Sequence, residues 1–563
     1  MAITRDKKWL KELLNNELQL VALALITGVF SGAVVTVYNV FAFYGEKYSV
    51  AWYEVLLSHP AFIPLLFVAL FTGAILTGTL IKFVPLVRGS GIPQIEGAIR
   101  GVLIFRWFRV LVSGFAASLA AIFLGMSAGS EGPSMLIGGC AGGSLGSALK
   151  RDRRKTRYLI TGGASAGLAV AFNAPLTGFL FAFEEAHKKF TPEIFITAFF
   201  SVVSGVLTRN GLRMLIGLID PAITVGSTFS SFDLSVIGSF ADVGRIAGIV
   251  LIAAAVTGLL GVGFYYTVLG LKDIFGRITF FKGTGKFLIP FGLAGAFGLI
   301  SVFEMGGGHS LIEALGTNGG ADPFAVTLNF ASTAVVAIVV VMVMKLIAAL
   351  CNMSCGVPCG VFIPMLAIGA CAGGLVSSAA QACGISAAYS DVIVMICMAT
   401  FFATIVKAPL TSIVMVFELT GSYNFNLLLP TMLGVAVGYM IGKLFRTEAI
   451  YDVLLDGFIK TDGVSKSGRK ERYLINVKSG CPADGKEVHD ILLPWSTVIT
   501  SLKRNDNDNI VPSGETVIFA GDVLTVETET DDRAGTFAEL TAIAGDQPDF
   551  PPDESLNPLK QIE

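Results

Sequence analysis

Three segments of this chain recur later in the same chain. The matched pairs are 132–143 (GPSMLIGGCAGG) with 363–374 (IPMLAIGACAGG), 174–177 (APLT) with 408–411 (APLT) and, more weakly, 89–91 (GSG) with 306–308 (GGG). The pairs keep the same order in both halves, at separations of 231, 234 and 217 positions. We therefore predict an internal duplication, in which two related halves build one fold.

The composition is that of a membrane protein. Hydrophobic residues make up 53% of the 563 positions and charged residues only 15%, so most of the chain cannot cover a water-exposed surface. Stretches such as 246–269 hold no charged residue, whereas roughly the last hundred residues are of ordinary polarity. We expect an all-α polytopic membrane domain at 1–464, with halves at 18–210 and 240–462, and a small soluble α+β domain at 472–545.

Glycine and proline interrupt the apolar region at 89–93, 129–133 and 356–364. Irregular backbone at membrane depth is tolerated only where protein buries it or where it lines a cavity. A helix that begins there directs free N–H groups and the positive end of its dipole inward, which favours an anion. Interrupted helices at matching positions of two halves are typical of a transporter site near the bilayer midplane.

Glu131 stands at one of these interruptions. In the register of the repeat it matches Phe362, and each residue precedes a proline step that can open a helix. An acidic residue between an apolar segment and a helix start is costly in a membrane, which indicates a functional role. The alternative is a buried glutamate that local hydrogen bonds satisfy.

The three loops, in this order, resemble the signature loops of the CLC family of chloride channels and chloride/proton antiporters, and the resemblance covers roughly residues 18 to 462. It implies broken helices in an inverted repeat, and a homodimer with one pathway for chloride and protons in each subunit. Glu131 would be the gate and Glu185 the inner proton-transfer glutamate. The anion would lie among Ser90, Gly91, Ile92, Gly132, Val361, Phe362 and Tyr451, which would offer hydroxyls and backbone amides.

The resemblance also suggests how the two ions are coupled. As a carboxylate, Glu131 can occupy the anion's own site, and protonation removes that competition. Glu185 favours exchange over passive conduction, because channels of the family usually lack an acid there; a solvated acid beside a basic cluster is the alternative. Ser90 favours chloride. One departure is Ser130, where many members have arginine or lysine.

We therefore expect a proton-coupled chloride antiporter. The alternatives are a passive voltage- or pH-gated chloride channel of the same fold, a fluoride/proton antiporter, and a membrane sensor that has lost transport. The segment 125–129 (GMSAG) fits the nucleophile pattern of serine hydrolases, but that pattern needs a histidine partner and the chain has four histidines, none in a matching context. We expect no enzyme activity, no metal or other cofactor, and no nucleic-acid partner.

Basic clusters at 150–155 and 187–189 set the expected orientation, because positively charged loops remain in the cytoplasm. We expect a multi-pass protein of the cell membrane whose N- and C-termini are both cytoplasmic.

In the soluble region, β-branched content and alternation predict strands at 473–477 and 516–526, and short helices at 486–492 and 536–543. This region resembles the C-terminal subdomain of RCK/TrkA-type regulators, on the segments 485–488, 511–518 and 520–524. The resemblance implies a dimerising regulatory module that binds a small molecule, with a nucleotide as one candidate. The tail at 546–563 is rich in proline and acidic residues, and we expect it to be disordered.

Overall fold

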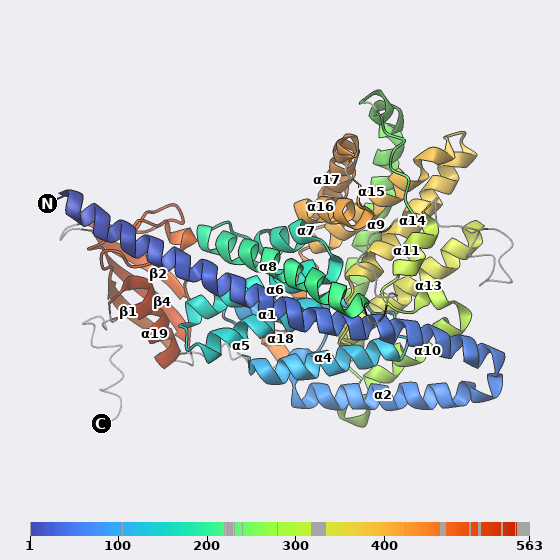
Figure 1. Ribbon diagram of the computed structural model, residues 1–563, viewed down its shortest axis with the longest axis horizontal. Coiled ribbons are helices and arrows are strands. Elements are labelled where there is room, and N and C mark those ends of the chain that lie inside the picture. The colour runs from blue at the N-terminus through green and yellow to red at the C-terminus, as the bar shows by residue number, and fades with distance from the viewer. Residues whose placement is uncertain are drawn as a thin grey trace.

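The computed structural model describes residues 2–103, 105–218, 220, 229, 231–238, 240–278, 280–316, 334–422, 424–461, 469–494, 497–504, 508–530, 533–546 and 548. The predicted fold class is confirmed: a large all-helical part is followed by a small α+β domain at one end of the molecule (Figure 1). Of the tail predicted at 546–563, all but residues 546 and 548 lie outside the described residues.

The membrane part consists of helices of very unequal length. In the first half they are α1 (Ala2–Ser58), α2 (Ile63–Phe83), α3 (Ile92–Ile99), α4 (Trp107–Phe123), α5 (Glu131–Ala148), α6 (Arg153–Phe172), α7 (Pro175–Phe181), the π-helix η3 (Ala182–His187) and α8 (Pro192–Gly217). In the second half they are α9 (Phe240–Gly276), α10 (Leu288–Ile300), α11 (His309–Leu315), α13 (Ala334–Cys355), α14 (Phe362–Ala382), α15 (Ser390–Val406), α16 (Pro409–Thr420), α17 (Leu428–Leu444) and α18 (Ile450–Thr461). Among the described residues, eight helical segments are long and apolar enough to cross a bilayer.

The breaks predicted in the apolar region are real helix boundaries. Gly91 precedes α3 with φ of 92°, in the left-handed region that favours glycine. A Cβ at this position would also lie 2.7 Å from the Cβ of Leu136 and 3.0 Å from the carbonyl oxygen of Gly132. The backbone of this loop therefore approaches α5 more closely than any larger residue permits.

The two halves are inverted relative to each other. Gly129 and Gly360, equivalent positions of the repeat, form an antiparallel bridge in which each amide nitrogen lies 2.8 Å from the other's carbonyl oxygen. α5 and α14 begin just after this bridge. In Figure 1, α5 extends toward the β-sheet and α14 extends away from it. The bridge thus lies between two helices that begin at the centre and run in opposite directions.

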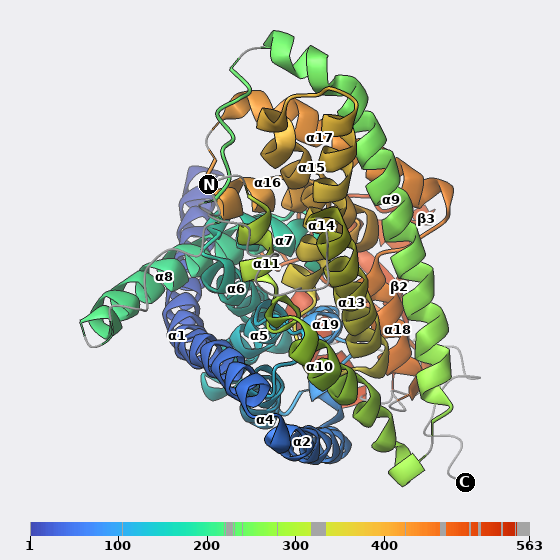
Figure 2. The same cartoon turned by 90° about the vertical axis from the view of Figure 1, so that its right-hand side faces the viewer.

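A second pair of equivalent residues, Glu184 and Glu418, joins the halves at α7 and α16, which lie side by side (Figure 2). Each carboxylate accepts three hydrogen bonds from the first turn of the other half's helix, where backbone donors have no partner within the helix. For Glu418 the donors are Leu176 N (2.8 Å), Thr177 N (2.8 Å) and Thr177 Oγ1 (2.6 Å), and for Glu184 they are Leu410 N (2.8 Å), Thr411 N (2.7 Å) and Thr411 Oγ1 (2.7 Å). The duplication therefore has a local two-fold axis in this region.

The two glycine loops that precede α3 and α11 are equivalent in the repeat but are held by different side chains. The amide of Gln94 donates to the carbonyl oxygens of Leu86 and Arg88 in the first half. In the second half the fully buried ammonium of Lys345 donates to the carbonyl oxygens of residues 303, 304 and 306, at 3.3, 3.1 and 3.2 Å. Both side chains satisfy carbonyl groups that the loop conformation leaves without helical partners.

The soluble domain is a four-stranded antiparallel sheet of order β1-β4-β2-β3 with one helix. Its elements are β1 (Arg469–Asn476), β2 (Thr497–Arg504), β3 (Asp508–Ile510), β4 (Val523–Thr530) and α19 (Arg533–Ala544). Tyr473, Leu502, Val526 and Leu540 form its buried core. The predicted strand at 473–477 and helix at 536–543 correspond to β1 and α19.

Two predictions for this domain are wrong. The strand predicted at 516–526 begins only at Val523, because the chain turns at Gly521, whose φ is 95°. The helix predicted at 486–492 is a three-residue 3₁₀ turn, Val488–Asp490. Its backbone amides are used elsewhere: Val488 N donates to the carbonyl oxygen of residue 516 and His489 N to that of residue 514.

Candidate ion pathway

The three interrupted loops meet at one place inside the protein. A Cβ at Gly132 would overlap the carbonyl oxygen of Ser90 and would lie 3.3 Å from the Cα of Gly360. The first turns of α3, α5 and α14 therefore begin within contact of one another. Because the first backbone N–H groups of a helix have no helical partner, this junction is rich in potential anion donors.

The predicted hydroxyl ligands are both buried at this junction. Within the part of the chain that the structure describes, the hydroxyls of Ser90 and Tyr451 have no hydrogen-bond partner. The ring of Tyr451 stacks on that of Phe362, the first residue of α14, with centroids 6.0 Å apart and planes at 21°. Buried hydroxyls normally form a hydrogen bond, so these two are suited to a site that binds a polar or charged ligand.

The structure places the other predicted contacts around the same junction. Gly91 and Ile92 open α3, Gly132 lies in the first turn of α5, and Val361 and Phe362 open α14. All five are close to helix starts, where backbone amides rather than side chains are available.

Glu131 is turned into the protein. Its side chain is only 1% exposed, and its carboxylate lies over the Gly129–Gly360 bridge, where a Cβ at Gly360 would be 3.0 Å from Oε2. Among the described residues, Oε2 has no hydrogen-bond partner. The residue also lines a cavity of about 510 Å³ together with Ser130. The charged and titratable residues that share this cavity are Glu46, Lys47, Arg213, His309 and Glu313.

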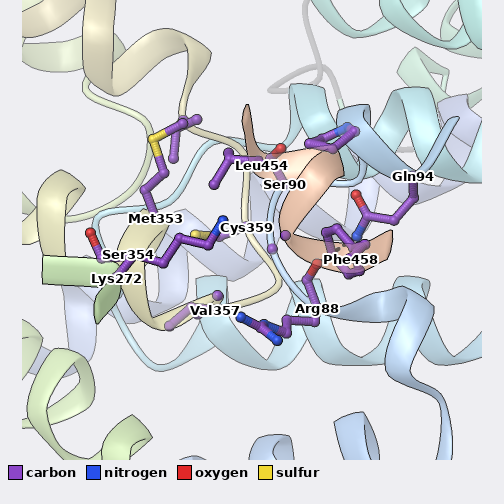
Figure 3. A pocket seen from close by; sticks show the side chains of 15 residues that line it. Arg88, Ser90, Gln94, Lys272, Met353, Ser354, Val357, Cys359, Leu454 and Phe458 are labelled. Carbon is purple, nitrogen blue, oxygen red and sulfur yellow. Dashed lines mark hydrogen bonds between the residues drawn. The ribbon is translucent and has the colours of Figure 1, made fainter. Parts of the chain in front are cut away.

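A smaller pocket of about 30 Å³ is lined by Ser90 and shares no lining residue with that cavity (Figure 3). Its charged lining residues are Arg88 and Lys272, and no described residue that lines it is acidic. The Arg88 guanidinium lies 5.7 Å from the ring centroid of Phe458, and Lys272 Nζ donates to the carbonyl oxygen of Val453 at 3.4 Å. The charged side chains that line this pocket are thus both cations, which favours the approach of an anion.

Glu185 lies on the π-helix η3 and is 1% exposed, although it is followed by the basic cluster. Neither carboxylate oxygen has a hydrogen-bond partner among the described residues. Tyr451 is within electrostatic reach of both Glu185 and Glu131. The phenol therefore interacts with both predicted proton-binding groups. A solvated Glu185, the alternative interpretation of the sequence, does not fit this burial.

The sequence did not identify Glu96 as a site residue. It lies on α3, is fully buried, and interacts electrostatically with Glu185. Its Oε2 is 3.7 Å from Arg100 Nη2, and Arg100 in turn donates to Asp452 at 2.7 Å. The sequence feature that could have identified Glu96 is an acidic residue within a short apolar segment that directly follows the predicted anion-binding loop at 89–93. The carboxylate oxygens of Glu96 have no hydrogen-bond partner among the described residues, so the two buried acids are neighbours without a direct hydrogen bond between them.

Known families match both parts of the chain. The family described as "Voltage gated chloride channel" matches residues 72–443, and the TrkA-C domain matches residues 472–541.

The relatives are transporters. The H(+)/Cl(-) exchange transporter ClcA of Vibrio cholerae is 30% identical over 447 residues, which is 78% of this chain and 89% of the relative. The protein of the same description from Citrobacter koseri is 30% identical over 396 residues, 69% of this chain and 78% of the relative.

Solved structures share the fold. A slow cyanobacterial Cl-/H+ antiporter superposes with a TM-score of 0.67 at 24% identity, over 79% of this chain and 99% of that chain. A CLC-type fluoride/proton antiporter gives a TM-score of 0.58 at 20% identity, over 76% of this chain and 96% of that chain. At these identities the likeness concerns the fold alone.

Proposed function

Because the chain belongs to the voltage gated chloride channel family, we propose that it exchanges chloride for protons across a cell membrane, with Glu131 as the gate and Glu185 as the inner proton-transfer residue. The relatives at 30% identity, which are named as H(+)/Cl(-) exchange transporters, support this choice of ions. Ser90 supports chloride over fluoride, which remains the alternative substrate.

The observation that carries the proposal is the burial of Glu131 where three helix starts meet. A carboxylate there competes with chloride for the same amide dipoles, since both are anions attracted to helix N-termini. A proton on Glu131 abolishes its charge and leaves the amides to chloride. Binding of the proton and of the anion are then linked through one site, as coupled exchange requires.

The second requirement is a separate proton route. The buried acids Glu96 and Glu185 support such a route, because each offers a carboxyl group that can carry a proton through the protein interior toward Tyr451 and Glu131. Toward the surface, the pair is bordered by Arg100, Lys188 and Asp452, of which the last two form an ion pair. These side chains are partly exposed, so the pair is close to solvent. A passive channel of the same fold is the second candidate, and it has no need of this buried acid pair.

We further propose that the end of the molecule bearing the soluble domain faces the cytoplasm. The beginning of α1 lies at that same end (Figure 1), together with the basic residues between α5 and α6. A homodimer, and a regulatory soluble domain that binds a small molecule or nucleotide, complete the proposal. Cross-linking in membranes tests the dimer, and thermal-shift titration with nucleotides tests the ligand.

Simultaneous recording of chloride and proton movement in reconstituted vesicles tests the exchange. We expect Glu131→Gln, which mimics the protonated gate, to abolish proton coupling while chloride still flows. Glu185→Gln should reduce proton flux more than chloride flux. Glu313→Gln is the matched control, since Glu313 lines the same cavity as Glu131 but is exposed. Proton pumping that survives Glu131→Gln would reject the gate, and a wild type that moves neither ion would favour a sensor.

A further inference from the structure

The soluble domain is docked on the helices that carry the proposed proton pathway. Leu492 packs against an apolar cluster of α6, α7, η3 and α8, formed by Tyr158, Phe179, Ala182, Phe183, Ile194 and Ala198. Polar contacts surround it. Lys486 forms an ion pair with Glu193, and Lys189 Nζ donates to the carbonyl oxygen of His489 at 2.9 Å. The contact is therefore an apolar centre with a polar rim, as in a specific interface.

Arg157 lies beside this contact and is only 6% exposed. Its Nε donates to the carbonyl oxygen of Ile99 at 2.5 Å, and its Nη1 donates to that of Leu493 at 3.3 Å. Ile99 is the last residue of α3, whose first turn opens at the anion junction. A cation at the carboxyl end of a helix stabilises the helix and its dipole. One guanidinium thus joins the soluble domain to the helix that begins beside Ser90.

The same turn of α6 also holds η3. The Thr161 hydroxyl donates to the carbonyl oxygen of Arg157 at 3.0 Å, and His187 Nε2 lies 2.7 Å from that hydroxyl oxygen. This hydrogen bond joins α6 to η3. His187 closes the π-helix that carries Glu185. Leu493 is thus bonded to the Arg157 side chain, and the Arg157 backbone is linked through Thr161 to His187, two residues after Glu185.

We propose that Arg157 is a positioning residue through which docking of the soluble domain sets the ratio of proton to chloride transport. The proposal rests on the exchange proposed above and names its regulation. Withdrawal of Leu493 removes one of the two anchors of the guanidinium, and the other anchor is the end of α3. The end of α3, which presents the anion loop, is then held by a guanidinium that has lost its second anchor, and α3 packs against η3, which carries Glu185. A ligand that binds the docked and undocked states unequally shifts this ratio.

Substitutions on the soluble side of the interface test the proposal in the full-length protein. Leu492→Ala removes the apolar contact, and Lys486→Glu opposes Glu193. We expect each to lower proton flux relative to chloride flux by about fivefold, the factor that one net hydrogen bond is worth. Lys478→Glu is the matched control, because Lys478 carries the same charge in the same domain but pairs with Asp546. It should keep the wild-type ratio.

Variants of the arginine itself give the complementary test. Arg157→Gln should lower the ratio as the interface variants do, and Arg157→Lys, which keeps the cation at the end of α3, should restore part of it. A purely structural role would reduce the number of active molecules and lower both fluxes equally, and that result would overturn the proposal. If the Arg157 variants do not fold, Leu492→Ala decides alone.

An unchanged ratio in Leu492→Ala and Lys486→Glu, with a coupled wild type, would overturn the positioning role and leave the exchange intact. A wild type without any proton flux would instead overturn the exchange, and the inference with it.

Discussion

Glu184 and Glu418 offer a test in which each residue is the control for the other. They occupy equivalent positions of the duplication and make the same three hydrogen bonds to the first turn of the opposite helix, with distances of 2.7 to 2.8 Å for Glu184 and 2.6 to 2.8 Å for Glu418. Glu184→Gln and Glu418→Gln change one oxygen to an NH₂ group and keep the shape of the side chain.

The expected cost follows from those contacts. A glutamine oxygen can accept the two bonds that Oε2 accepts, but its NH₂ group then faces a backbone N–H, so at least one charge-assisted bond is lost at about 1.5–3 kcal/mol. Loss of the negative charge at a helix N-terminus adds about 0.3–1 kcal/mol. Each substitution should therefore destabilise the protein by about 2–4 kcal/mol, and the two losses should agree within about 1 kcal/mol.

The consequences for transport should differ. Glu184 precedes the proposed proton-transfer residue Glu185, whereas Glu418 precedes Leu419. A loosened η3 displaces Glu185, so Glu184→Gln should lower the ratio of proton to chloride flux. Glu418→Gln should leave that ratio unchanged, although fewer molecules survive.

The assay combines thermal unfolding of the purified protein in detergent with flux measurements normalised to folded protein. Equal stability losses with unequal proton flux would support the reasoning. An unchanged unfolding midpoint for Glu418→Gln would refute the capping argument, and an equal fall of the flux ratio in both variants would refute the link to Glu185.

Two further predictions concern charges outside the junction. Arg88→Gln should raise the chloride concentration for half-maximal transport by about fivefold, since one partly screened charge is worth about 1 kcal/mol. Added impermeant salt should reduce this effect, and Lys82→Gln should show none. Chloride-dependent flux in reconstituted vesicles measures it. In the soluble domain, burial alone would raise the pKa of Asp522, but the hydrogen bonds from Arg504 at 2.6 and 2.8 Å lower it. The Arg504–Asp522 pair therefore stabilises the fold at pH values above the usual pKa of an aspartate, and this contribution is lost as the pH falls through the lower folded pKa. Asp522→Asn should thus destabilise the domain near pH 7 and less so in acid, which hydrogen exchange of β4 can measure. An equal loss of stability at both pH values would contradict this.

The breaks in the membrane helices were predictable because their causes are local. Proline in the first turn marks the starts of α3 and α5, and a glycine with positive φ also precedes α3. The recurrence of these signals in α14 and α16 made the duplication visible without any structure. A functional role for Glu131 was predictable in the same way, since an acidic residue at a helix start inside an apolar segment is costly in a membrane.

The acid pair was not predictable in the same way. Glu96 and Glu185 are far apart in the sequence, and they meet because the π-helix packs on α3. The role of Lys345 depends likewise on a loop that lies some forty residues earlier. In the soluble domain the alternating pattern continued past Gly521, so a turn was mistaken for the first half of a strand. Period-two alternation alone does not reveal where a strand begins.

The duplication explains why such a site can be both symmetric and directional. Equivalent backbone, as at Gly129 and Gly360, builds an amide-lined junction that has no preferred side. The side chains then break the symmetry, because Glu131 stands opposite Phe362. An anion site made of two equal helix ends alone would bind chloride with an affinity that does not depend on protons. In the proposed mechanism, one carboxyl group on one half only makes occupancy depend on protons, and the buried acids Glu96 and Glu185 supply those protons by a route that chloride does not share.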